Sequence, residues 1–125
     1  MTGERDPLTG EVIGAAIEVH REMGPGLLES VYQACLEQEL LLRGLAFEPQ
    51  ARWPLVYKGV TLMDEFVLDV FVPGRLVVEL KAVEKLLPVH EAQLLTYLRL
   101  TRTKVGLLIN FNVPVLRDGI KRMIL

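Results

Sequence analysis

The stretch FVLDVFVPGRLVVELK spans residues 66–81 and decides the fold. It consists of two apolar runs that each predict a β-strand, separated by Pro73-Gly74, a pair that favours a tight hairpin. One carboxylate, Asp69, interrupts the first run, and Glu79 and Lys81 interrupt the second. Because residues i and i+2 of a strand face the same side, Glu79 and Lys81 project together. The hairpin then brings Asp69 opposite Glu79 or near it.

Carboxylates inside apolar strands need a partner, because burying an uncompensated charge is costly. A bound metal ion is one such partner. The alternative is that Lys81 neutralises Glu79 in a structural ion pair, which an acid-x-Lys pattern also permits. The strands alone leave both interpretations open.

Helices are predicted on either side of this hairpin. Residues 8–22 carry apolar positions at a helical period, with Thr9 as a possible N-cap. A second helix is expected from about residue 26 to 43, after Pro25 at a first helical position, and Gly44 is expected to end it. Its predicted buried stripe consists of Leu28, Val31, Cys35 and Leu42. A third helix is expected over residues 91–100.

Further strands are predicted at residues 47–57, possibly broken at Pro49 or Pro54, and at 104–110, with a turn at Lys58-Gly59. Residues 119–125 are ambiguous between strand and helix. This order of elements describes an α/β fold, a sheet flanked by helices. At 125 residues, half of them apolar, the chain is expected to form one globular domain over residues 1–125.

The composition narrows the function classes. The apolar runs are too short to span a bilayer, and residues 1–7 are polar without an apolar signal core, so a cytoplasmic protein is expected. Cys35, the only cysteine, excludes an internal disulfide. Residues 1–79 hold 6 Lys/Arg and 13 Asp/Glu, whereas residues 80–125 hold 8 and 3. The basic part can form a face for an anionic partner, unless the two parts interleave and neutralise each other.

Three motifs and several further stretches carry a family resemblance. Asp69, nine intervening residues and Glu79-Leu80-Lys81 resemble the D-x(n)-(D/E)-x-K core of the PD-(D/E)XK nucleases. Gln93 and Tyr97 resemble the Q-x3-Y element of their RecB-like branch. Residues 26–32, GLLESVY, fit the G-x2-E-x2-Y signature of the small GxxExxY proteins, which residues 78–83, 90–98 and 106–111 also resemble. The resemblance implies a restriction-endonuclease-like core, a mixed central sheet of about four to five strands flanked by helices.

The resemblance also implies a role for each motif residue. Asp69, Glu79 and the Leu80 carbonyl would bind Mg²⁺ or Mn²⁺, hard cations that favour oxygen ligands, and Glu29 would complete the shell directly or through water. Lys81 would orient the attacking water or stabilise the charge on the phosphorus. Gln93 would support the site geometry, and Tyr97 would touch the substrate backbone. The alternatives are a solvated helix-start residue for Glu29 and a half-buried core aromatic for Tyr97.

The implied function is an Mg²⁺- or Mn²⁺-dependent nuclease, acting on DNA in preference to RNA. The alternative is a nucleic-acid or protein interaction module that keeps the nuclease fold without turnover. Arg99 and Arg102 are expected to bind substrate phosphates, with further cations available at Lys104, Arg117, Lys121 and Arg122. A homodimer is also expected, because twofold pairing is the commonest assembly.

Overall fold

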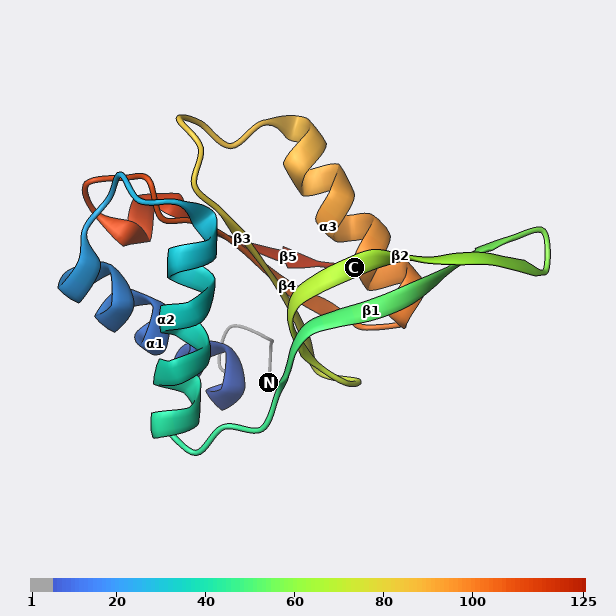
Figure 1. Ribbon diagram of the computed structural model, residues 1–125, viewed down its shortest axis with the longest axis horizontal. Coiled ribbons are helices and arrows are strands. Elements are labelled where there is room, and N and C mark those ends of the chain that lie inside the picture. Colours follow the sequence, from blue (N-terminus) through green and yellow to red (C-terminus); the bar gives the residue numbers. More distant parts are fainter. Residues whose placement is uncertain (1–5) are drawn as a thin grey trace.

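Figure 1 shows the computed structural model of the chain, which describes residues 6–125 except for the side chains of residues 64 and 65. The N-terminal half begins with helices α1 (Pro7–Met23) and α2 (Glu29–Leu42), followed by strands β1 (Glu48–Tyr57), β2 (Val60–Val72) and β3 (Leu76–Lys81). Helix α3 (Pro88–Thr101) precedes strand β4 (Val105–Asn110), a short 3₁₀ helix (Leu116–Gly119) and strand β5 (Ile120–Ile124).

The five described strands form one mixed sheet in the order β1-β2-β3-β4-β5. Strands β3 and β4 are parallel, and the other neighbours are antiparallel. Helix α3 supplies the crossover that a parallel pair requires. The α/β fold and a mixed sheet of four to five strands are therefore confirmed.

Helices cover both faces of the sheet (Figure 1). Leu76, Val78 and Leu80 pack with α1 and α2, whereas Val77 packs with α3 on the opposite face. Gly106 of β4 lets α3 approach closely, because a Cβ there would lie 2.9 Å from Leu94 Cδ1. Strand β3 is thus buried on both faces, which explains its continuous apolar sequence.

The N-terminal helices differ in detail from the prediction. Asp6, not Thr9, caps α1: its Oδ1 accepts a hydrogen bond from the Leu8 amide at 3.0 Å. Pro25 lies in the loop before α2, which begins only at Glu29. The predicted stripe of α2 was wrong at Leu28 and Leu42, which are exposed. The buried residues of α2 are Tyr32, Leu36 and Leu40, spaced four apart.

Two of the later elements, α3 and β2, are longer than predicted. Helix α3 begins at Pro88, three residues earlier, and His90 Nδ1 accepts a hydrogen bond from the Leu87 amide at its start. Strand β2 begins at Val60, and β1 continues through Pro49 and Pro54 because an edge strand tolerates proline. The ambiguous segment ends as strand β5. No helix in the described part of the chain is long and apolar enough to cross a membrane.

Candidate active site

Asp69 and Glu79 meet where β2 and β3 separate. The backbone pairing of these strands ends at Val70 and Val78. Beyond that point the carboxylates take over the hydrogen bonding: Asp69 Oδ2 accepts from the Leu80 amide at 2.8 Å, and Glu79 Oε2 accepts from the Asp69 amide at 3.1 Å. The predicted proximity of the two carboxylates is confirmed. Their orientation is fixed by the backbone itself.

The surroundings of this pair disfavour the ionised form of both carboxyl groups. Glu79 is 4% exposed. Burial, followed by the negative charge of Asp69, raises the pKa of Glu79 to about 9. Burial also raises the pKa of Asp69, although hydrogen bonds from the Leu80 amide and the Gln50 side chain oppose the shift. Without a bound cation, the site therefore favours a protonated Glu79 at neutral pH.

Lys81 lies beside the pair but does not neutralise it by direct contact. No ion pair joins Lys81 to Glu79 or Asp69 in the described structure, so the predicted alternative of a Glu79–Lys81 bridge is not formed. Instead, Lys81 Nζ donates to Gln93 Oε1 at 3.2 Å, and Gln93 Nε2 donates to the Tyr97 hydroxyl at 3.0 Å. The i, i+4 spacing of Gln93 and Tyr97 on α3 aligns this chain of contacts. The neutral amide of Gln93 thus holds the Lys81 ammonium group close to the two carboxylates.

Tyr97 belongs to the core as well as to this chain of contacts. Its ring is buried against Phe66 in an edge arrangement, with centroids 5.8 Å apart. Burial, followed by the charge of Glu79, raises the pKa of its hydroxyl. The core-aromatic interpretation of Tyr97 is therefore correct for the ring, and only the hydroxyl is available to the site.

Helix α2 reaches the pair from the other face of the sheet. Burial, followed by the charge of Asp69, raises the pKa of Glu29 at the start of the helix. Gln33, one turn later, donates to the Asp69 carbonyl at 2.8 Å and to Glu37 at 2.7 Å. Glu29 thus lies within electrostatic reach of Asp69. The described residues nevertheless contain no group of three or more His, Cys, Asp or Glu side chains arranged to hold a metal ion.

Tyr32 has a structural role. Its ring stacks on Phe111 with centroids 4.5 Å apart, and its hydroxyl donates to the Gly24 carbonyl at 2.6 Å and accepts from the Leu27 amide at 3.1 Å. These bonds hold the loop that precedes α2. The tyrosine of the G-x2-E-x2-Y stretch therefore fixes the start of the helix on which Glu29 stands.

Gln50 of β1 was not predicted as a site residue. Its Nε2 donates to Asp69 Oδ1 at 3.1 Å, and its backbone has a positive φ of 48°. A left-handed conformation is costly for a residue with a Cβ, and glutamine has no special tolerance for it. The sequence offers no signal for this contact, because a glutamine on an edge strand is ordinarily a solvated surface residue.

Asn110 was also missed. It is buried at the end of β4, paired with Lys81 in the sheet, and its side chain holds both the amide and the carbonyl of Val83 at 3.0 and 2.9 Å. It thereby fixes the chain directly after Lys81. A buried asparagine closing an apolar strand is a signal that sequence reasoning could have used, since buried amides are kept where they satisfy backbone groups.

The predicted basic residues do not gather at the carboxylates. Arg99 is exposed and donates to Thr96, and Arg102 ends α3 in a left-handed conformation. Both stand at the opposite end of α3 from Gln93, on the order of 10 Å along the axis. Lys121 of β5 pairs with Glu91 at 3.1 Å. Any contact of Arg99 and Arg102 with a substrate would therefore extend beyond the immediate site.

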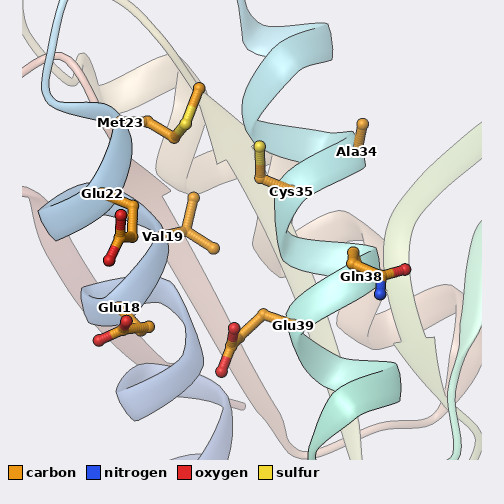
Figure 2. Close-up of a pocket in the computed structure, with 8 residues that line it drawn as sticks. All are labelled: Glu18, Val19, Glu22, Met23, Ala34, Cys35, Gln38 and Glu39. Carbon is orange, nitrogen blue, oxygen red and sulfur yellow. The ribbon is translucent and has the colours of Figure 1, made fainter.

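A cavity of about 320 Å³ lies away from these residues, between α1 and α2 (Figure 2). Its floor is Val19, Met23 and Cys35, and carboxylates including Glu18 and Glu39 surround it. Those two already pair with Arg21 and Arg43. The cavity contains none of the predicted site residues. The carboxylate pair, and not this cavity, is the candidate active site.

Comparison with known families agrees with this geometry. The family model described as the PD-(D/E)XK nuclease superfamily matches residues 6–123. The chain belongs to this superfamily. The match includes every candidate residue described above, and membership indicates a nuclease-type activity on nucleic acid and the divalent-metal dependence typical of such enzymes. No curated protein and no solved structure matched the chain.

Proposed function

We propose that the chain is an Mg²⁺- or Mn²⁺-dependent nuclease that hydrolyses phosphodiester bonds at the Asp69–Glu79 pair, with DNA favoured over RNA. The observation that carries the proposal is the pair itself: a buried glutamate and a partly buried aspartate whose mutual repulsion no direct ion pair relieves in the described structure. Such an arrangement is unfavourable in a purely structural role and suits a site that binds a cation.

The donor set fits a hard divalent cation. Asp69, Glu79 and the Leu80 carbonyl would hold it, with Glu29 contributing through water because it forms no three-residue cluster with the pair. When bound, the ion would lower the pKa of a water molecule and supply positive charge to the phosphate. The raised pKa values support this assignment, because the charge of Lys81 offsets burial only in part and a directly bound cation would favour the ionised pair.

The neighbouring side chains would act on the phosphate and the attacking water. Lys81, held by Gln93, would place its ammonium group toward the negative charge that develops on the phosphate oxygens. Its position partly excludes water, which makes the ammonium charge more effective. Tyr97 would hold Gln93 in the orientation that accepts from Lys81, and its hydroxyl would be the part that meets substrate. Asn110 would keep the chain after Lys81 from shifting.

The finer family assignment rests on the same residues. The G-x2-E-x2-Y stretch supports membership in the GxxExxY group, because Tyr32 fixes the loop and Glu29 begins the helix beside Asp69. The contact between Gln93 and Tyr97 supports the RecB-type Q-x3-Y element. Arg99 and Arg102 would bind phosphates flanking the scissile one, which agrees with their distance from the pair.

The test is a cleavage assay on labelled single- and double-stranded DNA and RNA with Mn²⁺, Mg²⁺ or chelator. We expect metal-dependent cleavage by the wild type and a loss of about 10³-fold or more in Glu79→Gln, which keeps the size of the side chain and removes a ligand charge. Glu84→Gln is the matched control, because Glu84 is exposed on the loop just after β3. Its cleavage should stay within about 2-fold of the wild type.

Metal binding is measured separately by the rise in melting temperature on adding Mn²⁺. A wild type that is stabilised through Glu79 yet cleaves none of the four substrates would favour the interaction module over the nuclease. Cleavage that persists equally in Glu79→Gln would place the activity at another site or in a contaminant.

A further inference from the structure

The hairpin of β1 and β2 projects far beyond the rest of the molecule (Figure 1). Its base is anchored, since Ala51, Trp53 and Phe66 pack on the core beside α3. Neither core cluster of the described residues includes any residue from 54 to 63. We call residues 54–63 the distal arm. It is a two-stranded ribbon, an element that is marginally stable in water when nothing covers it.

The distal arm is apolar on its surface. Large side chains that are about half exposed or more occupy both of its strands: Val56 at 50%, Tyr57 at 61%, Val60 at 57%, Leu62 at 55% and Met63 at 49%. Scattered exposed apolar residues are ordinary, but five within eight positions form a patch, and patches of this kind mark interaction sites. We propose that the distal arm is a dimerisation surface whose occupant is the distal arm of a second copy of this chain.

Charge favours a second copy over nucleic acid. The only charged residue in the distal arm is Lys58. Contacts to phosphates depend on Lys and Arg side chains, so the surface does not suit a nucleic-acid backbone. An apolar surface without a charge pattern is complementary to itself, which is the requirement of a twofold interface.

The area is sufficient for a dimer. Half-exposed side chains of this size each present on the order of 100 Å², so two arms together supply on the order of 1,000 Å². That is about the lower limit for a specific interface. The packing uses side chains rather than strand addition, because Pro54 interrupts the row of amide donors on β1, the edge strand.

The experiment is analytical ultracentrifugation of the full chain from about 1 to 200 μM in chelator. We expect a monomer–dimer equilibrium in the wild type. Leu62→Lys should raise the dimer Kd at least about 30-fold, as the loss of a central apolar contact does, without lowering the melting temperature of the monomer. Leu42→Lys is the matched control, since Leu42 is an exposed leucine (71%) at the end of α2, and its Kd should equal that of the wild type.

Disulfide trapping supplies a second readout. In a Cys35→Ser background, which removes the only cysteine, Tyr57→Cys should form a covalent dimer on mild oxidation and Ser30→Cys on α2 should not. A wild type that remains monomeric at 200 μM would overturn the proposal, and so would open-ended association without a dimer plateau. A dimer that Leu42→Lys disrupts and Leu62→Lys leaves intact would assign the interface to another face. DNA binding that depends on Leu62 in a monomeric protein would make the distal arm a nucleic-acid contact instead.

Discussion

The two ends of strand β2 both depart from the usual distribution of polar and apolar side chains. At one end the partly buried carboxylate of Asp69 lies beside the buried Glu79, while at the other end the large apolar side chains of Val60 and Leu62 lie in water. Ordinary strands place these groups the other way round. A folded chain tolerates each inversion where binding would relieve it, and the proposals above supply such binding: a cation for the carboxylates and a second distal arm for the apolar side chains.

After Glu79→Gln, the largest expected effect is at Lys81, beside the carboxylates. Lys81→Ala should reduce metal-dependent cleavage about 10²- to 10³-fold, because it removes the cation that Gln93 holds beside the pair. The melting temperature should change little, since Lys81 forms no ion pair with either carboxylate. Single-turnover cleavage of a short oligonucleotide measures the effect.

Lys85→Ala is the control for Lys81→Ala. Lys85 is exposed four residues later, so it carries the same charge near the same loop. If both variants lose activity equally, the loss reflects the general attraction of phosphate to positive charge and not a position at the reacting group.

The second effect is on the pH dependence of stability in chelator. The folded pKa of Glu79 is about 9, above its ordinary value of 4.5. A raised pKa means that stability is fully present below about pH 4.5 and is lost as the pH rises through 9. Between those limits the free energy of unfolding should fall by up to ~1.4 kcal/mol per pH unit, hence roughly 2–3 kcal/mol from pH 6 to 8. Urea denaturation at each pH measures it.

Glu79→Gln should flatten this slope, because the amide does not titrate. Glu84→Gln should leave the slope unchanged. A wild type whose stability rises across this pH range would mean that Glu79 is ionised and stabilised by its neighbours in the metal-free protein. That result would contradict the proposal that the carboxylate pair needs a bound cation.

The sequence alone predicts that Asp69 and Glu79 lie together, because the evidence for it is local. A carboxylate inside FVLDVFV is conspicuous, and the i, i+2 rule and one tight turn place Asp69 beside Glu79 without further information. Strand β3 was predictable from the sequence as well. A short, continuous apolar run that follows a turn is typical of a strand buried on both faces.

The residues that support the two carboxylates could not be predicted from local sequence patterns. Gln50 reaches Asp69 through the register of β1 on β2, a property of the whole sheet, and its positive φ contradicts local propensity. The predicted stripe of α2 was wrong at Leu28 and Leu42 because both are apolar yet exposed, whereas the buried ring of Tyr32 sets the register of the buried face. The distal arm was missed because β2 was expected to start at residue 66.

The third effect is on the stability of the pair itself. Asp69→Asn should raise the melting temperature in chelator by a few degrees, about 1 kcal/mol, since the amide keeps the shape and removes a charge that burial disfavours. Mn²⁺ should then stabilise the wild type and the variant much less. Asp118→Asn, at an exposed position, is the control. A variant that melts lower in chelator, with no response of the wild type to Mn²⁺, would mean that Asp69 is the satisfied half of an ion pair.

The smallest expected effect concerns two residues that share a left-handed backbone conformation. Gln50 and Lys58 both have a φ of 48°, and both lie on the β1–β2 hairpin, one near the carboxylates and one at the tip of the distal arm. Glycine adopts this conformation without a Cβ penalty, so Lys58→Gly should stabilise the protein by somewhat under 1 kcal/mol. Gln50→Gly gains the same relief but loses the hydrogen bond to Asp69, a loss of about the same size, so its net change in stability should be close to zero.

Cleavage should distinguish the two variants further. Gln50→Gly should be about 3- to 5-fold slower because the Asp69 carboxylate is less well oriented, whereas Lys58→Gly should cleave a short oligonucleotide at the wild-type rate. Thermal melts and single-turnover rates of the two variants measure both quantities. Equal stabilisation and unchanged cleavage in both would show that the left-handed backbone at Gln50 serves only the bend of β1, and that Asp69 needs no support from the edge strand.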